Sequence, residues 1–223
     1  AALENDSEMV RNGAISALGR IADPIAIPYL EEVADGYRPM VVWGQHREGQ
    51  RHCVVGSDNL LGGKLAMQRL VAGGAKRIAF VGDTNAPEFA ARYSGASQVA
   101  QSFGLALSEL PAHLATSGMT TEIAALMKEA ADNYDGLFAA TDLLALACLG
   151  ELRKIGRNVP KDMKIVGFDD LPIAQQTAPP LTTIRQDIAG GARAIVQLLL
   201  RRIAGEETES IVMPPTLVVR GTA

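Results

Sequence analysis

The sequence is poor in the residues that build most metal sites and catalytic triads. Its only histidines are His46, His52 and His113, so a histidine-based metal site or a Ser–His–Asp triad is poorly supplied. The two cysteines, Cys53 and Cys148, lie far apart and lack the paired spacing of metal ligands. We therefore expect reduced structural thiols in a cytoplasmic protein, with no cofactor.

The chain also lacks an excess of positive charge and any long apolar run. Its net charge is -4 and its pI is about 5.4, which argues against direct nucleic-acid binding by this chain. No apolar stretch approaches the roughly 18 residues of a membrane-spanning helix. The polar, acidic start of the sequence is not that of a signal peptide. We expect no membrane partner.

What remains is an ordinary globular composition, with 223 residues, 48% hydrophobic and 21% charged. This length predicts one large or two small domains. Residues 1–36 carry apolar side chains at helical spacing and predict two helices, the second ended by Gly36.

From residue 39 onward, short apolar runs alternate with longer amphipathic ones, a pattern that predicts βα units and a parallel sheet with helices on both faces. Predicted strands lie within 39–44, 52–59, 76–83, 136–141, 164–170 and 211–221, and predicted helices within 60–72, 88–104, 120–134, 142–156 and 188–205.

Polar residues collect where these strands end. Ligands of open parallel sheets bind outside the carboxyl ends of the strands, which draws attention to Asp83, Asp142 and the pair Asp169–Asp170. The adjacent carboxylates favour ligand binding, with turn formation as the alternative. Neighbouring residues point in opposite directions, so acid–base catalysis by the pair is disfavoured. The glycines near residues 62–82 fit neither a dinucleotide fingerprint nor a phosphate-binding loop.

Two further side chains are candidates for ligand contact. Arg92 lies just beyond a strand-end loop, and its planar guanidinium suits vicinal hydroxyls or a carboxylate; an exposed helix arginine is the alternative. Trp43, the only tryptophan, ends a strand, where it either packs in the core or forms an aromatic wall for a ligand.

Several motifs occur in an order and spacing that resemble the effector-binding domain of LacI/GalR-type transcriptional regulators. They are VGSDNLLGGKLAMQRLVAGGAKRIAFVGD, RYSGASQVAQSFGL, the stretch from GLFAATDLL to RRIAGE, and PPTLVVRGTA. The resemblance covers roughly residues 39–223. It implies a periplasmic-binding-protein-like (Rossmann-like) α/β fold, in which two subdomains flank a cleft for a small molecule, often a sugar. Members are usually homodimers and are not enzymes.

Carried over residue by residue, the resemblance implies an effector-contacting arginine at Arg92, with Ser94 as a weaker candidate. It implies a hydroxyl-binding carboxylate at Asp169 and a hinge-adjacent contact at Gln186. The family often has Asn where this chain has Thr141, which offers one hydroxyl in place of a two-ended amide. Asp142 is expected to cap the following helix.

The chain departs from the family before residue 39. Members carry a longer series of strands and helices there, whereas residues 1–38 resemble one HEAT-type helical repeat. A lone repeat needs a neighbour on which to stack. We therefore expect a chimera or truncated form: a helical hairpin at 1–38 and a partial effector-binding domain at 39–223. Within the latter, 55–185 would form the ligand-side subdomain, and 39–54 with 186–223 the incomplete second one.

The sequence thus predicts a sugar-sensing module that lacks a DNA-reading helix-turn-helix and whose ligand affinity is impaired. The alternative is a recombined scaffold without biochemical activity. An enzyme that uses Asp169 or Asp170 on a glycoside is disfavoured, because two carboxylates must flank the scissile bond.

Overall fold

The computed structural model describes residues 39–46, 50, 52–113 and 119–223. The chain divides into two compact units, which are described separately. One comprises Ala1–Ser57 and Asp187–Met213, and the larger one comprises Asp58–Gln186 and Pro214–Ala223. The predicted HEAT-type hairpin at 1–38 lies outside the described residues.

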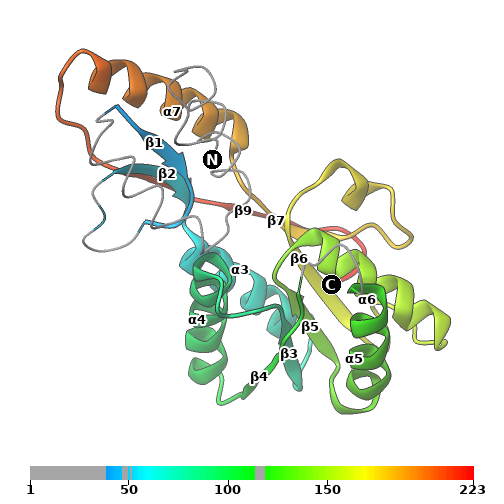
Figure 1. Ribbon diagram of the computed structural model, residues 1–223. Helices are drawn as coiled ribbons and strands as arrows, with labels where there is room; N and C mark the ends of the chain where they lie inside the picture. The colour runs from blue at the N-terminus through cyan, green and yellow to red at the C-terminus, as the bar shows by residue number, and fades with distance from the viewer. Residues whose placement is uncertain (1–38, 47–49, 51, 114–118) are drawn as a thin grey trace. The chain divides into compact units, whose positions relative to one another are not determined.

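The larger unit is built on a six-stranded sheet with the order β4-β3-β5-β6-β7-β9 (Figure 1). All neighbouring pairs are parallel except β7 and β9. The central strands are short apolar runs that are buried along their length, as strands covered on both faces should be. The bounds are β3 Ile78–Val81, β4 Leu107–Leu110, β5 Gly136–Ala139, β6 Lys164–Asp169, β7 Thr182–Arg185 and β9 Thr216–Val218.

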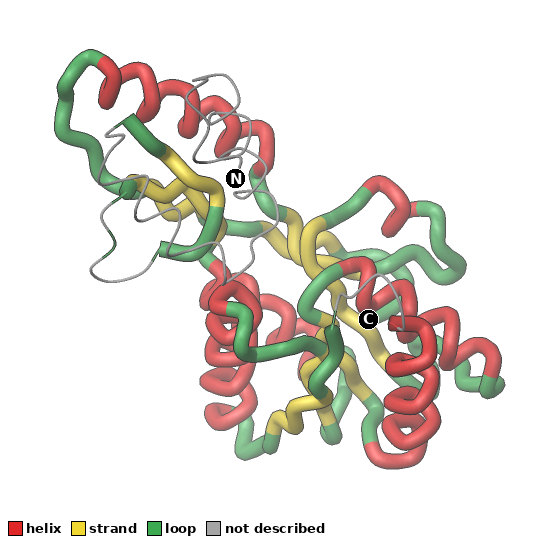
Figure 2. The backbone as a smooth tube through the Cα atoms, in the orientation of Figure 1, coloured by secondary structure: helices red, strands yellow, loops and turns green. Residues whose placement is uncertain are grey.

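Helices cover both faces of this sheet (Figures 1 and 2). A short 3-10 helix, η2, follows β6. The bounds are α3 Asn59–Ala72 and α4 Pro87–Ser102 on one face, α5 Met119–Asn133 and α6 Asp142–Lys154 on the other, and η2 Pro172–Gln175. The parallel sheet with helices on both faces, predicted from strand–helix alternation, is confirmed.

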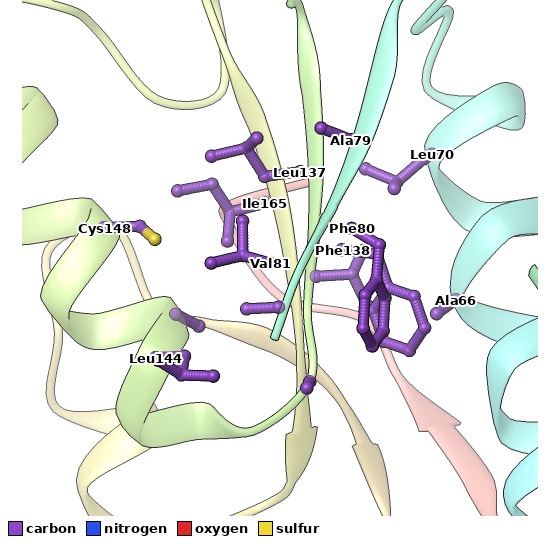
Figure 3. Packing of buried hydrophobic residues seen from close by; sticks show 14 of the residues in the cluster. Ala66, Leu70, Ala79, Phe80, Val81, Leu137, Phe138, Leu144, Cys148 and Ile165 are labelled. Carbon is purple, nitrogen blue, oxygen red and sulfur yellow. The ribbon is translucent and has the colours of Figure 1, made fainter. Parts of the chain in front are cut away.

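The core lies in two layers, one on each side of the sheet (Figure 3). Phe80 and Phe138 project toward α3, with their rings edge to face at a centroid distance of 5.3 Å. Leu137 and Ile165 project toward α6, which carries Leu144 and Cys148 on the same side of the sheet. This alternation follows from the two-residue period of strands.

Helices α3 and α4 approach each other at glycines. A Cβ at Gly63 would lie 1.9 Å from the backbone oxygen of Arg92, and a Cβ at Gly95 would lie 1.9 Å from that of Leu60. No side chain fits at either position unless the helices separate. This contact therefore sets the position of Arg92 relative to the start of α3.

The smaller unit contains a parallel three-stranded sheet with the order β1-β2-β8 and the helix α7. The indole of Trp43 packs against α7, where a Cβ at Gly191 would lie 2.1 Å from the ring. The bounds are β1 Val41–Trp43, β2 Cys53–Ser57, α7 Ile188–Ile203 and β8 Ile211–Met213.

The structure corrects three sequence-based expectations. Residues 214–223 do not remain with the smaller unit as predicted, because β9 pairs with β7 in the larger sheet. Strand β4 was not predicted; it lies at the sheet edge, is only four residues long and contains Ser108 and Glu109. Thr141, not Asp142, is the N-cap of α6, because its Oγ1 accepts from the backbone N–H of Leu144.

None of the helices in the described ranges is long and apolar enough to cross a membrane.

We expect Gly95→Ala to destabilise the larger unit by on the order of 3 kcal/mol, because the added methyl group would overlap a backbone carbonyl that cannot rotate away. Urea unfolding followed by circular dichroism measures the effect.

Gly150→Ala is the matched control. Gly150 lies inside α6 with nothing within 4 Å of its added methyl, so this change should stabilise the helix by about 0.5–1 kcal/mol. Equal unfolding midpoints for the two variants would contradict the close helix contact.

Candidate functional site

Three neighbouring strands of the larger sheet bring three of the six predicted contact residues to one edge. β5, β6 and β7 are adjacent and parallel, so their carboxyl ends meet. Thr141 follows β5, Asp169 ends β6, and Gln186 follows β7 directly. Helix α6, which follows β5, begins at the same edge.

Arg92 enters this edge from α4 and is buried, with only 5% of its surface exposed. Its Nε donates to Asn59 Oδ1 at 2.8 Å and its Nη1 to the Ala140 carbonyl at 2.5 Å. The guanidinium carbon lies 3.6 Å from the centroid of the Phe168 ring, a cation–π distance. These contacts fix the plane of the guanidinium, and Nη2 makes no hydrogen bond within the described part of the chain.

Burial lowers the pKa of Arg92 to about 10, against the opposing effects of nearby Asp169, Glu88 and Asp142. The group therefore remains a cation at neutral pH. A desolvated cation of this kind interacts strongly with any acceptor placed beside it.

Asp169 lies close enough to Arg92 for their charges to interact, but the two do not hydrogen-bond to each other. Burial raises the pKa of Asp169, and the charge of Arg92 and a hydrogen bond from Gln186 act in the opposite direction. Gln186 Nε2 donates to Asp169 Oδ1 at 2.7 Å. The structure thus brings Arg92, Asp169 and Gln186 together.

Asp170 has a different role from that of its neighbour. Its carboxylate accepts from Arg185 Nε and from Arg220 Nη2, each at 2.6 Å. Burial alone would raise the pKa of Asp170, but the two arginines outweigh it and hold that pKa below its usual range. This supports the interpretation that Asp170 shapes the loop, and the two carboxylates do not form a pair that shares a proton.

Asp142, expected only as a helix cap, lies wholly buried behind Asp169. It accepts from the Thr183 hydroxyl at 2.5 Å and from the Leu171 backbone N–H at 2.8 Å. Burial raises the pKa of Asp142 to about 6, although both hydrogen bonds lower it.

Two predicted residues are not brought to this group. Ser94 is exposed on α4, and a separation of two residues turns it about 200° around the helix from Arg92. Trp43 belongs to the smaller unit, where its ring packs on α7. Its contact there fits the packing interpretation, and a ligand role for Trp43 stays a prediction.

Sequence reasoning missed Phe168, Asn59 and the buried role of Asp142. The two-residue period of strands could have indicated Phe168, because it places the side chains of residues 166 and 168 on one face of β6 and those of 167 and 169 on the other. For Asn59 and Asp142 no spacing rule applies, since their partners lie 33 and 29 or more residues away in sequence.

The arrangement offers one cation and one carboxylate with unused hydrogen-bonding capacity. Both suit a ligand that carries hydroxyl groups, since such bonds are charge-assisted. Within the described ranges, no three His, Cys, Asp or Glu side chains lie together in a way that could hold a metal ion.

Comparison with known proteins agrees with this geometry. The sequence pattern of the periplasmic binding protein-like domain matches residues 67–223. The chain belongs to this family. The domain thus has the fold expected from its resemblance to LacI/GalR-type regulators.

Its relatives are transcriptional regulators. It is 32% identical to the HTH-type regulator CelR of Thermobifida fusca over 208 residues, which cover 91% of this chain and 58% of CelR. A solved CelR–cellobiose complex matches with a TM-score of 0.71 and 31% identity over 82% of this chain and 58% of that one. A LacI family regulator from Enterococcus faecium with bound ribose matches with a TM-score of 0.77 and 28% identity, over 90% and 75%.

These matches support an effector-binding core of LacI/GalR type. The domain spans 58% of the length of CelR. The alignment with CelR covers 91% of this chain, which is more than residues 39–223 contain. The alignment therefore includes part of the first 38 residues.

We expect Asp170→Asn to lower the free energy of unfolding by about 2–4 kcal/mol, because it leaves the mostly buried Arg220 without its carboxylate. Asparagine tolerates the left-handed backbone of this position, so the backbone should be preserved. Since the pKa of Asp170 is lowered on folding, its contribution is fully present above about pH 4 and is lost as the pH falls further.

Urea unfolding at pH 7 and at pH 3 measures both effects. Glu206→Gln is the control, because it breaks an exposed ion pair with Arg201 and should change stability by less than about 0.5 kcal/mol. A loss for Asp170→Asn no larger than that of the control would contradict the role given to Asp170.

Proposed function

We propose that the domain is a non-enzymatic sensing module that binds a sugar at the carboxyl edge of its larger sheet. The observation that carries the proposal is the Arg92 guanidinium, buried over Phe168 beside Asp169 and not hydrogen-bonded to it. A buried cation and carboxylate held apart in this way offer a donor and an acceptor for the same ligand.

The chemistry favours a polyol. A sugar hydroxyl donates to the Asp169 carboxylate, and a neighbouring hydroxyl accepts from Arg92 Nη2. Because a sugar is neutral, its binding adds no net charge beside Arg92 and Asp169. Relatives whose structures contain cellobiose or ribose support this ligand class.

Gln186 and Thr141 would make secondary contacts. The amide nitrogen of Gln186 is engaged by Asp169, so its amide oxygen would accept from the ligand. The Thr141 oxygen accepts from the helix, which leaves its hydroxyl hydrogen to donate. Ser94 is a weaker candidate, and a ligand contact by Trp43 stays a prediction from the sequence.

The finer part of the sequence-based hypothesis is also a proposal: a HEAT-type segment joined to a regulator core, with weakened affinity for its ligand. The alternative is a scaffold that folds but binds nothing. The two differ in whether any sugar shifts the melting temperature.

We expect titration calorimetry with D-ribose and cellobiose to detect saturable binding of at least one of them at millimolar concentration or below. Arg92→Ala and Asp169→Asn should weaken it about 10-fold or more, because each removes a charge-assisted hydrogen bond.

Arg193→Ala is the matched control, since Arg193 is an exposed arginine of α7 and its loss should leave affinity unchanged. No heat and no melting shift with either sugar would favour the scaffold. Binding that survives both site variants would contradict the assignment of Arg92 and Asp169.

We also propose that the domain forms a homodimer. A hollow of about 650 Å³ on the larger unit is lined by α6 and the loop that follows η2, and includes Leu146, Leu149, Gly150 and Pro179. A second copy would bury these apolar side chains.

We expect light scattering after size-exclusion chromatography to give twice the chain mass. Gly150→Glu should shift the protein toward the monomer, because it places a charge in the hollow at a position where an added Cβ meets no atom within 4 Å. Gly150→Ala should remain dimeric. A monomer for the unsubstituted protein at 100 μM, roughly the range of weak association, would contradict the proposal.

A further inference from the structure

The loop that presents Asp169 has an unfavourable backbone. Asp169 and Asp170 both have positive φ, at 118° and 58°, in a region that residues with a Cβ rarely adopt. Two such residues in succession persist only where their surroundings hold them. The direction of the Asp169 carboxylate therefore depends on what fixes the residues around it.

Asp142 acts on this loop at Asp169 and at Leu171, the residue that follows the strained pair. Its backbone N–H lowers the pKa of the Asp169 carboxyl group, and its own carboxylate accepts from the Leu171 N–H at 2.8 Å. The same carboxylate accepts from Thr183 of β7. One buried residue thus links α6, β7 and the loop after β6.

The space for this carboxylate comes from Gly167 of β6, where a Cβ would lie 2.3 Å from Asp142 Oδ1. The glycine of the VGFDD sequence is therefore required by Asp142 rather than by a turn. Three separate segments are arranged around one fully buried carboxylate.

We propose that Asp142 is a positioning residue of the site: by holding the Leu171 N–H and the Thr183 hydroxyl, it fixes the strained loop and so sets the direction in which Asp169 faces Arg92. The expected effect of Asp142 on ligand affinity rests on the proposed sugar site. Its expected effect on the conformation of the loop does not.

A substitution can remove the charge of Asp142 and keep its hydrogen bonds. Arg92, Asp169 and Asp170 are the ionisable groups that act on it. An asparagine can still accept from the Leu171 N–H through its oxygen and can donate to the Thr183 hydroxyl. Asp142→Asn therefore keeps both contacts and removes the charge, whereas Asp142→Ala removes both contacts.

The test has a readout that needs no ligand. Hydrogen exchange at the Leu171 amide should accelerate about 10-fold or more in Asp142→Ala and be restored to near the original rate in Asp142→Asn. Unchanged protection in Asp142→Ala would overturn the proposal, whether or not the protein binds a sugar.

The second readout is calorimetric affinity for D-ribose and cellobiose. Asp142→Ala should bind about 10-fold or more weakly, and Asp142→Asn should recover most of the loss. If the unsubstituted protein binds neither sugar but the exchange result holds, the proposed function fails and the loop assignment stands. If the protein binds and Asp142→Ala binds equally well, the positioning role is wrong.

A third readout reports on burial of the carboxylate itself. Because folding raises the pKa of Asp142 to about 6, the folded state keeps a proton that the unfolded state loses near pH 4. The stability that this proton provides is complete below pH 4 and is lost as the pH rises through 6. The melting temperature relative to Asp142→Asn should therefore fall between pH 4 and pH 7, and a constant difference would contradict an ionisable buried Asp142.

If Asp142→Ala does not fold, Thr183→Val and Thr183→Ser replace it. Valine removes the hydroxyl from Asp142 while filling the same space, and serine keeps it. Faster Leu171 exchange in the valine variant alone supports the proposal, and equal exchange in both overturns it.

Discussion

The burial of one guanidinium group is the constraint on which the rest of the site depends. A charge removed from water must be compensated by hydrogen bonds and by nearby opposite charge. For Arg92 these come from Asn59, the Ala140 carbonyl, the Phe168 ring and the field of Asp169. Because α3, β6 and the residue after β5 supply these groups to an arginine of α4, the position of the guanidinium depends on the packing of all four elements.

Small residues make that packing possible. Gly63 and Gly95 let two helix backbones meet, Gly62 makes room for the Phe168 ring, and Gly167 makes room for the Asp142 carboxylate. None of these four glycines has a positive φ, and each is needed because other atoms lie too close to leave room for a side chain. The sequence has 22 glycines, and these four help to set the positions of Arg92, Phe168 and Asp142 because they leave room for neighbouring atoms.

Periodicity and strand-end chemistry were enough to predict the parallel sheet, its helices and the sheet edge that carries Asp169. Gln186 was predicted only from the resemblance to the family. They predicted β conformation within 211–221 but could not predict that β9 joins the larger sheet, because three residues after a proline carry no sign of which unit they will join. They missed β4 because an edge strand needs no continuous apolar run. Asp142 was assigned to a cap by its place at a helix start, yet its partners are tertiary and lie far along the chain.

The contacts of Thr222 tie the last segment of the chain into the larger unit. This residue is buried, its hydroxyl donates to the Ile165 carbonyl, and its oxygen accepts from the Thr182 N–H. The larger unit is therefore discontinuous: its last piece, Pro214–Ala223, is translated only after the whole segment Asp187–Met213 of the smaller unit. During synthesis, the edge of β7 that pairs with β9 therefore has no partner strand until Pro214–Ala223 has been made, and the larger unit is completed only after the smaller one.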